Sequence, residues 1–268
     1  PRCLLAELNT HKILAPSSFL VYNAQSSRAV PIKAAIENLL SGETYYEPSY
    51  WGKNQAGMSA SEENNEDVII HDELAVKSRS VTRERAWKEA ARNAIKYSEA
   101  FDKAGYHKQI VGRLLEPFSM VKVLLSGTEW SNFFNLRVHP AAEPHFRDLA
   151  IKMYLALRES SPKVLLHGEW HLPYIKYSHN DYGDLIYVGS QGEILDLETA
   201  KSISLSCVAQ TSYRKHDETL EKAEVVIGRL FNGDVVHASP AEHIATPMED
   251  TSDILRTLNY WEDGVTHM

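Results

Sequence analysis

The chain has 268 residues, of which 43% are hydrophobic and 24% are charged, as is typical of globular proteins. Its 28 Lys and Arg side chains against 36 Asp and Glu give a formal net charge of -8, which argues against non-specific binding to nucleic acids. Two cysteines, Cys3 and Cys207, are too few for a disulfide framework or a cysteine zinc ribbon, and they fit a reducing compartment.

The first 80 residues are predicted to contain one helix and a long exposed segment. Apolar residues recur at helical spacing from Pro31 to Leu40. Residues 41–80 are rich in Gly, Ser, Asn and Glu, and we expect a loop insertion at about 56–80. The first residues, 1–6, resemble the interior of a secondary-structure element, so we expect the natural N-terminus to lie upstream.

The middle of the chain is dominated by helical periodicity. A long helix is predicted over 81–104, ended by Gly105, and a second over 107–116, ended by Pro117. Further along we expect a strand over 120–125, a short helix over 130–137, and a helix from Pro144 to about Glu159 with Phe146, Leu149, Ala150, Met153 and Leu157 facing inward.

The last third mixes turns, strands and one clear helix. Residues 171–200 resemble turns plus a hairpin, 202–209 a buried strand, and 219–231 a helix capped by Asp217 or Thr219. Because strands and helices are intermixed without a repeating βαβ order, the sequence favours an α+β fold over a doubly wound sheet. No apolar run approaches the roughly 18 residues of a membrane helix, so we expect no membrane partner.

Two histidine clusters invite a chemical interpretation. His167 and His171 lie four apart with Glu169 between them, as in zinc hydrolases, but Gly168 and Pro173 argue against the helix that such a site needs. A structural or substrate-lining role is the favoured alternative, and we predict no metal.

The second cluster runs from His237 to His243. Ser239, Pro240 and Glu242 could open a helix with a capping box, which accounts for the Ser and the Glu. It does not account for the flanking histidines.

Two other segments could hold an anion. Thr10-His11-Lys12 followed by the segment Asn23–Arg28 supplies short hydroxyls and a guanidinium, which suit a phosphate. Arg137 ends a largely apolar segment that starts at Asn132. Such an arginine is commonly snorkelling or salt-bridged, and the alternative is a buried cation that faces a ligand.

Together these clusters resemble the flavin-dependent thymidylate synthases, the ThyX family. The family signature Arg-His-Arg, spacer, Ser-x-Asn-x-x-Ser-x-Arg is matched at its two ends by Thr10-His11-Lys12 and the segment Asn23–Arg28. The segments that resemble further family motifs are 113–117 (Arg-x-x-x-Pro), 132–137 (Asn-Phe-x-x-Leu-Arg), 209–213 and 237–243. In ordinary members the motif matched by 237–243 precedes the Arg-His-Arg segment, whereas here it comes last, so the chain resembles the circularly permuted, phage-type branch. Permutation is tolerated where termini lie close together at the surface.

The resemblance implies one ThyX-like domain over 1–268, with mixed helices around a mainly antiparallel sheet. It implies reductive methylation of dUMP to dTMP, with FAD as cofactor and NADPH and methylenetetrahydrofolate as co-substrates. Arg137 and Ser26 are then the catalytic residues, and dUMP is bound by Ser26, Arg28, Arg113 and Arg137. FAD is bound by His11, Lys12, Asn23, Asn132, Ser212, Ser239 and Glu242.

The resemblance also implies a homotetramer in the cytoplasm, or in the host cytoplasm for a phage protein. Thr10 and Lys12 stand where the family has arginine, and the 13–22 segment is longer than the family spacing. Lysine keeps the charge but loses the bidentate fork. A dUMP hydroxymethylase of phage DNA modification, or an inactive nucleotide- or flavin-binding homologue, therefore remains open as an alternative.

Overall fold

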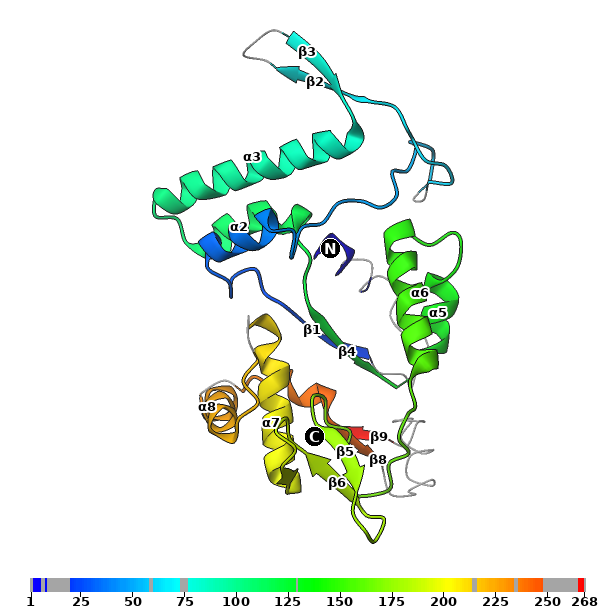
Figure 1. Ribbon diagram of the computed structural model, residues 1–268, viewed down its shortest axis with the longest axis vertical. Helices are drawn as coiled ribbons and strands as arrows, with labels where there is room; N and C mark the ends of the chain where they lie inside the picture. The colour runs from blue at the N-terminus through cyan, green and yellow to red at the C-terminus, as the bar shows by residue number, and fades with distance from the viewer. Residues whose placement is uncertain are drawn as a thin grey trace. The chain divides into compact units, whose positions relative to one another are not determined.

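The protein is described here by a computed structural model (Figure 1), which covers residues 2–5, 8, 20–57, 60–72, 77–128, 130–213, 216–233, 236–247 and 265–267. Helices and short antiparallel strands alternate along these residues, which confirms the predicted α+β class. The chain divides into two compact units, one built from residues 1–11, 26–121 and 133–160, the other from 12–25, 122–132 and 161–268.

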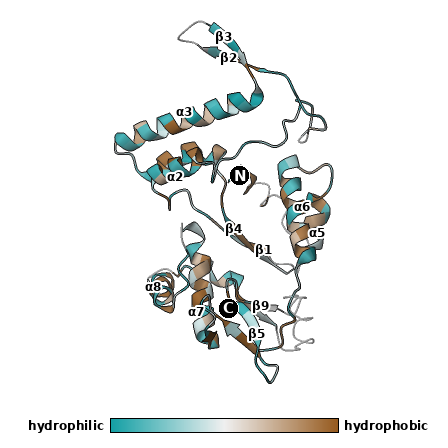
Figure 2. Ribbon diagram, in the orientation of Figure 1, coloured by the Kyte–Doolittle hydropathy of each residue, from teal (hydrophilic) through white to brown (hydrophobic). Residues whose placement is uncertain are grey.

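The core of the first unit lies between two helices and a 3-10 segment. These elements are α2 (Ile32–Leu40), α3 (Arg83–Lys103) and η2 (Gly112–Phe118), preceded by the four-residue α4 (Lys108–Val111) and accompanied by η1 (Arg2–Leu4). Apolar side chains from α2, α3, α4 and η2 form one cluster, made of Ile32, Ile36, Leu39, Ala91, Val111, Leu115 and Phe118. Figure 2 shows α3 as mainly hydrophilic with isolated hydrophobic positions, as expected for a helix with one buried stripe.

The ends of these helices follow their capping residues. Thr82 accepts a hydrogen bond from the Arg85 amide at the start of α3, and Gly105 adopts the positive φ of a C-terminal cap. The helix predicted over 107–116 is present, but it changes at Gly112 from α-helix to a 3-10 segment, and its predicted end at Pro117 is wrong because Pro117 lies inside that segment. Proline has no amide hydrogen to continue an α-helix.

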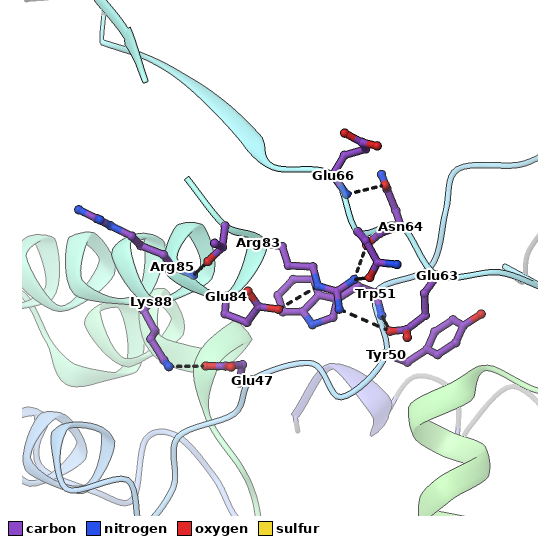
Figure 3. Close-up of polar contacts among 12 residues, drawn as sticks. Glu47, Tyr50, Trp51, Glu63, Asn64, Glu66, Arg83, Glu84, Arg85 and Lys88 are labelled. Atoms are coloured by element: carbon purple, nitrogen blue, oxygen red, sulfur yellow. Dashed lines mark hydrogen bonds and ion pairs between the residues drawn. The ribbon is translucent and has the colours of Figure 1, made fainter. Parts of the chain in front are cut away.

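The exposed segment between α2 and α3 is anchored at Arg83. Figure 3 shows its guanidinium between Trp51, Glu84 and the 63–65 stretch: Nε donates to Glu84 at 2.9 Å, and Nη1 donates to the carbonyl oxygen of Asn64. The guanidinium carbon lies 5.7 Å from the Trp51 ring centroid. Residues 61–69 are exposed, as expected, but the sequence analysis missed the antiparallel hairpin of β2 (Val68–Asp72) and β3 (Lys77–Val81).

The remaining helices of the first unit are α5 (Ser131–Arg137), whose first two residues belong to the second unit, and α6 (Pro144–Glu159). Both helices were predicted. Phe133 and Phe146 pack edge to face with ring centroids 6.1 Å apart. The predicted inward orientation of Leu149 and Leu157 is wrong, since these side chains are 45% and 51% exposed. The buried stripe of α6 is narrower than predicted and consists of Phe146 and Ala150.

The second unit is organised around α7 (Leu197–Ala209), which packs against α8 (Leu220–Phe231). The strand predicted over 202–209 is wrong, because these residues are the buried half of α7. The Asp196 side chain accepts from the Thr199 amide and starts the helix. Thr219 caps α8 by accepting from the Lys222 amide, which confirms one of the two predicted caps.

Short antiparallel strands complete the second unit. They are the predicted hairpin region with β5 (Lys176–His179), β6 (Leu185–Val188) and β7 (Ile194–Leu195), the pair β8 (Ala245–Pro247) and β9 (Val265–His267), and the pair β1 (Leu20–Ala24) and β4 (Val123–Gly127). Strand β4 begins three residues later and ends two residues later than the strand predicted over 120–125. None of the helices among the described residues combines the length and the apolar character needed to cross a bilayer.

Candidate functional site

All four residues predicted to bind dUMP belong to the first unit. Ser26 and Arg28 lie in the turn that follows β1, Arg113 lies in η2, and Arg137 ends α5. The turn is closed by a hydrogen bond from the Ala29 amide to the Ser26 carbonyl oxygen at 3.1 Å. The Arg28 amide donates to Ser26 Oγ at 3.3 Å, so the serine hydroxyl shapes the loop that carries the arginine.

The turn lies against η2. A Cβ atom at Gly112 would approach the Ser27 carbonyl oxygen to 3.2 Å, so the backbones of the turn and of η2 pass closely at this point. Arg113 is the next residue after Gly112. Arg28 and Arg113 are both exposed, and within the described part of the chain neither guanidinium has a carboxylate partner. The nearby carboxylate of Glu116 pairs with Arg2 at 3.2 Å. Two cations on adjoining segments are therefore available to an anion.

Arg137 has a different environment. Its side chain is 5% exposed, and its guanidinium carbon lies 4.9 Å from the Phe146 ring centroid. A snorkelling arginine would keep its guanidinium in water, so this interpretation is wrong. The interpretation as a buried cation is confirmed, and that this cation faces a ligand stays a prediction.

The residues predicted to bind FAD, where the structure describes them, belong to the second unit. Asn23 lies in β1, Asn132 near the start of α5, Ser212 at the end of η3 (Gln210–Ser212), and Glu242 in η4 (Ala241–His243). Strand β1 contacts both η3 and η4, so the fold brings three of these segments together. Ser239 lies in the turn before η4, while His11 and Lys12 lie outside the described residues.

The predicted capping box at Ser239 and Glu242 does not form. Pro240 occupies the cap position of η4, no side chain caps this element, and the Ser239 and Glu242 side chains are exposed. A three-residue 3-10 turn has too few orphan amides to require such a box. Both side chains therefore remain available to a ligand.

Comparisons of the chain with protein-family models, with curated proteins and with solved structures found no match. The family resemblance therefore rests on the sequence motifs alone.

Two buried polar atoms in the second unit suit a ligand or a positioning role. Asn132 Nδ2 and His243 Nε2 are buried and have no hydrogen-bond partner among the described residues. Leaving such groups unpaired costs stability, so each calls for an explanation. The Asn132 amide lies at a predicted FAD position, and its free donor fits the acceptor-rich flavin and its phosphates.

His243 joins two segments that the sequence analysis treated separately. Its Nδ1 lies 2.9 Å from Ser126 Oγ, and Ala245, two residues further along, forms a β-bridge with His171. Burial lowers the pKa of His243 to about 4, with a smaller contribution from His171, and burial alone lowers the pKa of His171. Both rings are neutral at neutral pH. The sequence analysis missed Ser126, which belongs to no motif.

The remaining candidates carry less chemistry. His167 lies in a turn and His171 in the bridge, which confirms that this segment is not helical. Over the residues that the structure describes, no three His, Cys, Asp or Glu side chains gather around one metal position. A cavity of about 260 Å³ in the first unit is lined by Leu40, Tyr45, Lys88 and Arg92 among others, and by none of the predicted site residues.

Proposed function

We propose that the chain is a flavin-dependent thymidylate synthase, which converts dUMP to dTMP with methylenetetrahydrofolate as carbon donor and NADPH as reductant. The observation that carries this proposal is the buried guanidinium of Arg137 on the Phe146 ring, at the position where the motif expects a cation against uracil. The family membership and the reaction both belong to this proposal.

In this proposal, the exposed arginines of the first unit bind the nucleotide phosphate. Arg28 and Arg113 come from two segments in close backbone contact and have no carboxylate of their own within the described residues. A guanidinium presents a planar fork that matches phosphate oxygens. Ser26 holds the shape of the turn and supplies a hydroxyl beside Arg28.

Arg137 has the electrostatic role. Methylation at C5 requires the pyrimidine to develop negative charge, and a fixed cation stabilises that charge without reorganising. The Phe146 face and the surrounding apolar side chains hold the guanidinium in one orientation and keep water away.

The second unit is proposed to supply most of the residues that bind the flavin. Reduced FAD supplies the electrons that turn the transferred carbon into a methyl group, and the protein orients it. Asn23, Asn132, Ser212, Ser239 and Glu242, with His11 and Lys12, are the residues proposed for this task. We also propose that the protein acts as a homotetramer in the cytoplasm.

Product analysis tests this proposal. Protein reconstituted with FAD is incubated with dUMP, methylenetetrahydrofolate and NADPH, and the nucleotide is analysed by mass spectrometry. A gain of CH2 is expected. A gain of CH2O identifies a hydroxymethylase instead, and dUMP binding without NADPH oxidation identifies an inactive homologue, which the substitutions at Thr10 and Lys12 favour as the second candidate.

A further inference from the structure

His243 and Ser126 form a polar link between parts of the second unit that are distant in sequence. The His243 side chain is 2% exposed, and its Nδ1 lies 2.9 Å from Ser126 Oγ across a separation of 117 residues. Neither residue is among those proposed to bind dUMP or FAD. A buried histidine with a hydroxyl partner therefore needs a role of its own.

The position of Ser126 in its strand relates this link to the proposed flavin site. Ser126 pairs with Val21, and Leu124 pairs with Asn23, in the antiparallel register of β1 and β4. Residues opposite each other, and residues two apart, point to the same face of such a ribbon. The side chains of Ser126 and Asn23 therefore share one face, and η4 contacts β1 as well.

The other end of the link lies beside a proposed flavin residue. Glu242 directly precedes His243 in η4, a single 3-10 turn with no side-chain cap. On its far side, η4 leads into Ala245, which exchanges two backbone hydrogen bonds with His171. So short a turn has little rigidity of its own, and its orientation depends on such attachments.

We propose that Ser126 and His243 are positioning residues of the flavin site, whose hydrogen bond holds Ser239 and Glu242 over the face of the β1–β4 ribbon that carries Asn23. This inference rests on the proposed function for its ligand. The neutral state of His243 supports it, because a neutral ring can exchange one hydrogen bond with a hydroxyl without a buried charge. An apolar residue would avoid the unpaired Nε2 but could not make the link.

Four variants test the link. Ser126→Ala and His243→Leu remove it, whereas His243→Asn places an amide where Nδ1 lies and can restore it. Ser204→Ala is the matched control, because Ser204 is fully buried in the same unit and its hydroxyl donates to the Pro173 carbonyl oxygen at 2.8 Å and not to a residue of η4.

The first readout is the FAD dissociation constant, measured by flavin fluorescence. Ser126→Ala and His243→Leu should weaken binding about tenfold, the equivalent of one lost hydrogen bond at a preorganised site. His243→Asn and the Ser204→Ala control should stay close to wild type. Unchanged FAD binding in Ser126→Ala, or equal weakening in the Ser204→Ala control, overturns the inference.

Amide hydrogen exchange without FAD separates this inference from the proposed function. Loss of the link should speed exchange of the amides from Ala241 to Ala245 in Ser126→Ala, while those of α7 keep their wild-type rates. Unchanged exchange in η4 overturns the inference. Wild-type protein that binds no FAD instead overturns the proposed function, and the exchange data alone then decide whether the link positions the turn.

Discussion

In the first unit, the side chains proposed to bind dUMP are three arginines and one serine. In the second unit, those around the proposed flavin site are mostly neutral, and some form hydrogen bonds within the protein. Arg28 and Arg113 are exposed and have no carboxylate partner in the described part of the chain. His243 is buried and bonded to Ser126. Binding of dUMP should therefore depend on charge and on the salt concentration, whereas binding of FAD should depend on how precisely its contact residues are positioned.

Arg137 is the exception in the first unit, since it is a cation in a buried environment. Its contact with Phe146 replaces the water that surrounds Arg28 and Arg113. An electrostatic effect is larger where water is excluded. The comparison thus predicts that Arg137 affects the chemical step and that the exposed arginines affect binding.

The largest expected effect follows from removing Arg137. Arg137→Ala should lower turnover at saturating dUMP by about 100-fold to 1,000-fold, the usual loss when a preorganised charge-stabilising group is removed. FAD binding should stay intact, because most of its proposed residues lie in the second unit. Steady-state kinetics and a flavin titration check both. Arg137→Lys keeps the charge without the planar stack and should restore only part of the rate, while full turnover in Arg137→Ala would refute the assigned role.

Acid should destabilise the second unit through His243. Its pKa is about 4 in the folded protein and near 6.5 in the unfolded chain, so the unfolded chain binds more protons between these values. Stability should therefore fall as the pH is lowered from about 6.5 toward 4, by about 2 kcal/mol between pH 7 and pH 5. His171, whose pKa is also lowered, acts in the same direction.

Urea unfolding at several pH values measures this effect. His243→Asn should show a flatter pH dependence, because its side chain does not titrate. A slope identical to that of the wild type would show that His243 is not buried as a neutral ring.

A smaller effect is expected for the exposed arginines. Arg28→Ala and Arg113→Ala should each weaken dUMP binding about tenfold, as expected for one charge-assisted hydrogen bond, and the difference from wild type should shrink at high salt. Isothermal titration with dUMP at two salt concentrations measures this. Arg229→Ala, which removes an exposed arginine from α8 in the second unit, is the control. Equal losses in all three variants would point to overall charge and not to a site.

The smallest effect is expected at Arg83, which anchors an exposed segment and touches neither proposed site. Arg83→Ala should lower the free energy of unfolding by about 1 kcal/mol or less, because its ion pairs with Glu63 and Glu84 are partly exposed to solvent. The segment 52–66 should become more sensitive to a glutamate-specific protease, while nucleotide and flavin binding stay unchanged. Unaltered cleavage would show that Arg83 does not hold the segment.

Long elements with one buried stripe and clear caps could be predicted from the sequence. Helices α3 and α8 combine helical spacing with a threonine cap, and both are present. Helix α7 was mistaken for a strand because its second half is buried on all sides, which removes the periodicity that distinguishes the two structures. The narrow buried face of α6 depends on its neighbours and not on its own sequence.

The candidate site was predictable only where motifs mark it. Arg137 and Asn132 stand in a recognisable segment, and the burial of the arginine excludes the snorkelling interpretation. Ser126 carries no local signal, because its partner His243 lies 117 residues further along the chain and is brought to it by the fold. The single ThyX-like domain over 1–268 stays a prediction.

The visible absorption spectrum of the purified protein tests the central proposal most directly. After incubation with FAD and removal of the free cofactor, the protein should retain the flavin band, and added dUMP should perturb it. NADPH should bleach the band. A preparation that stays colourless after reconstitution with FAD would contradict the proposal that this chain binds a flavin.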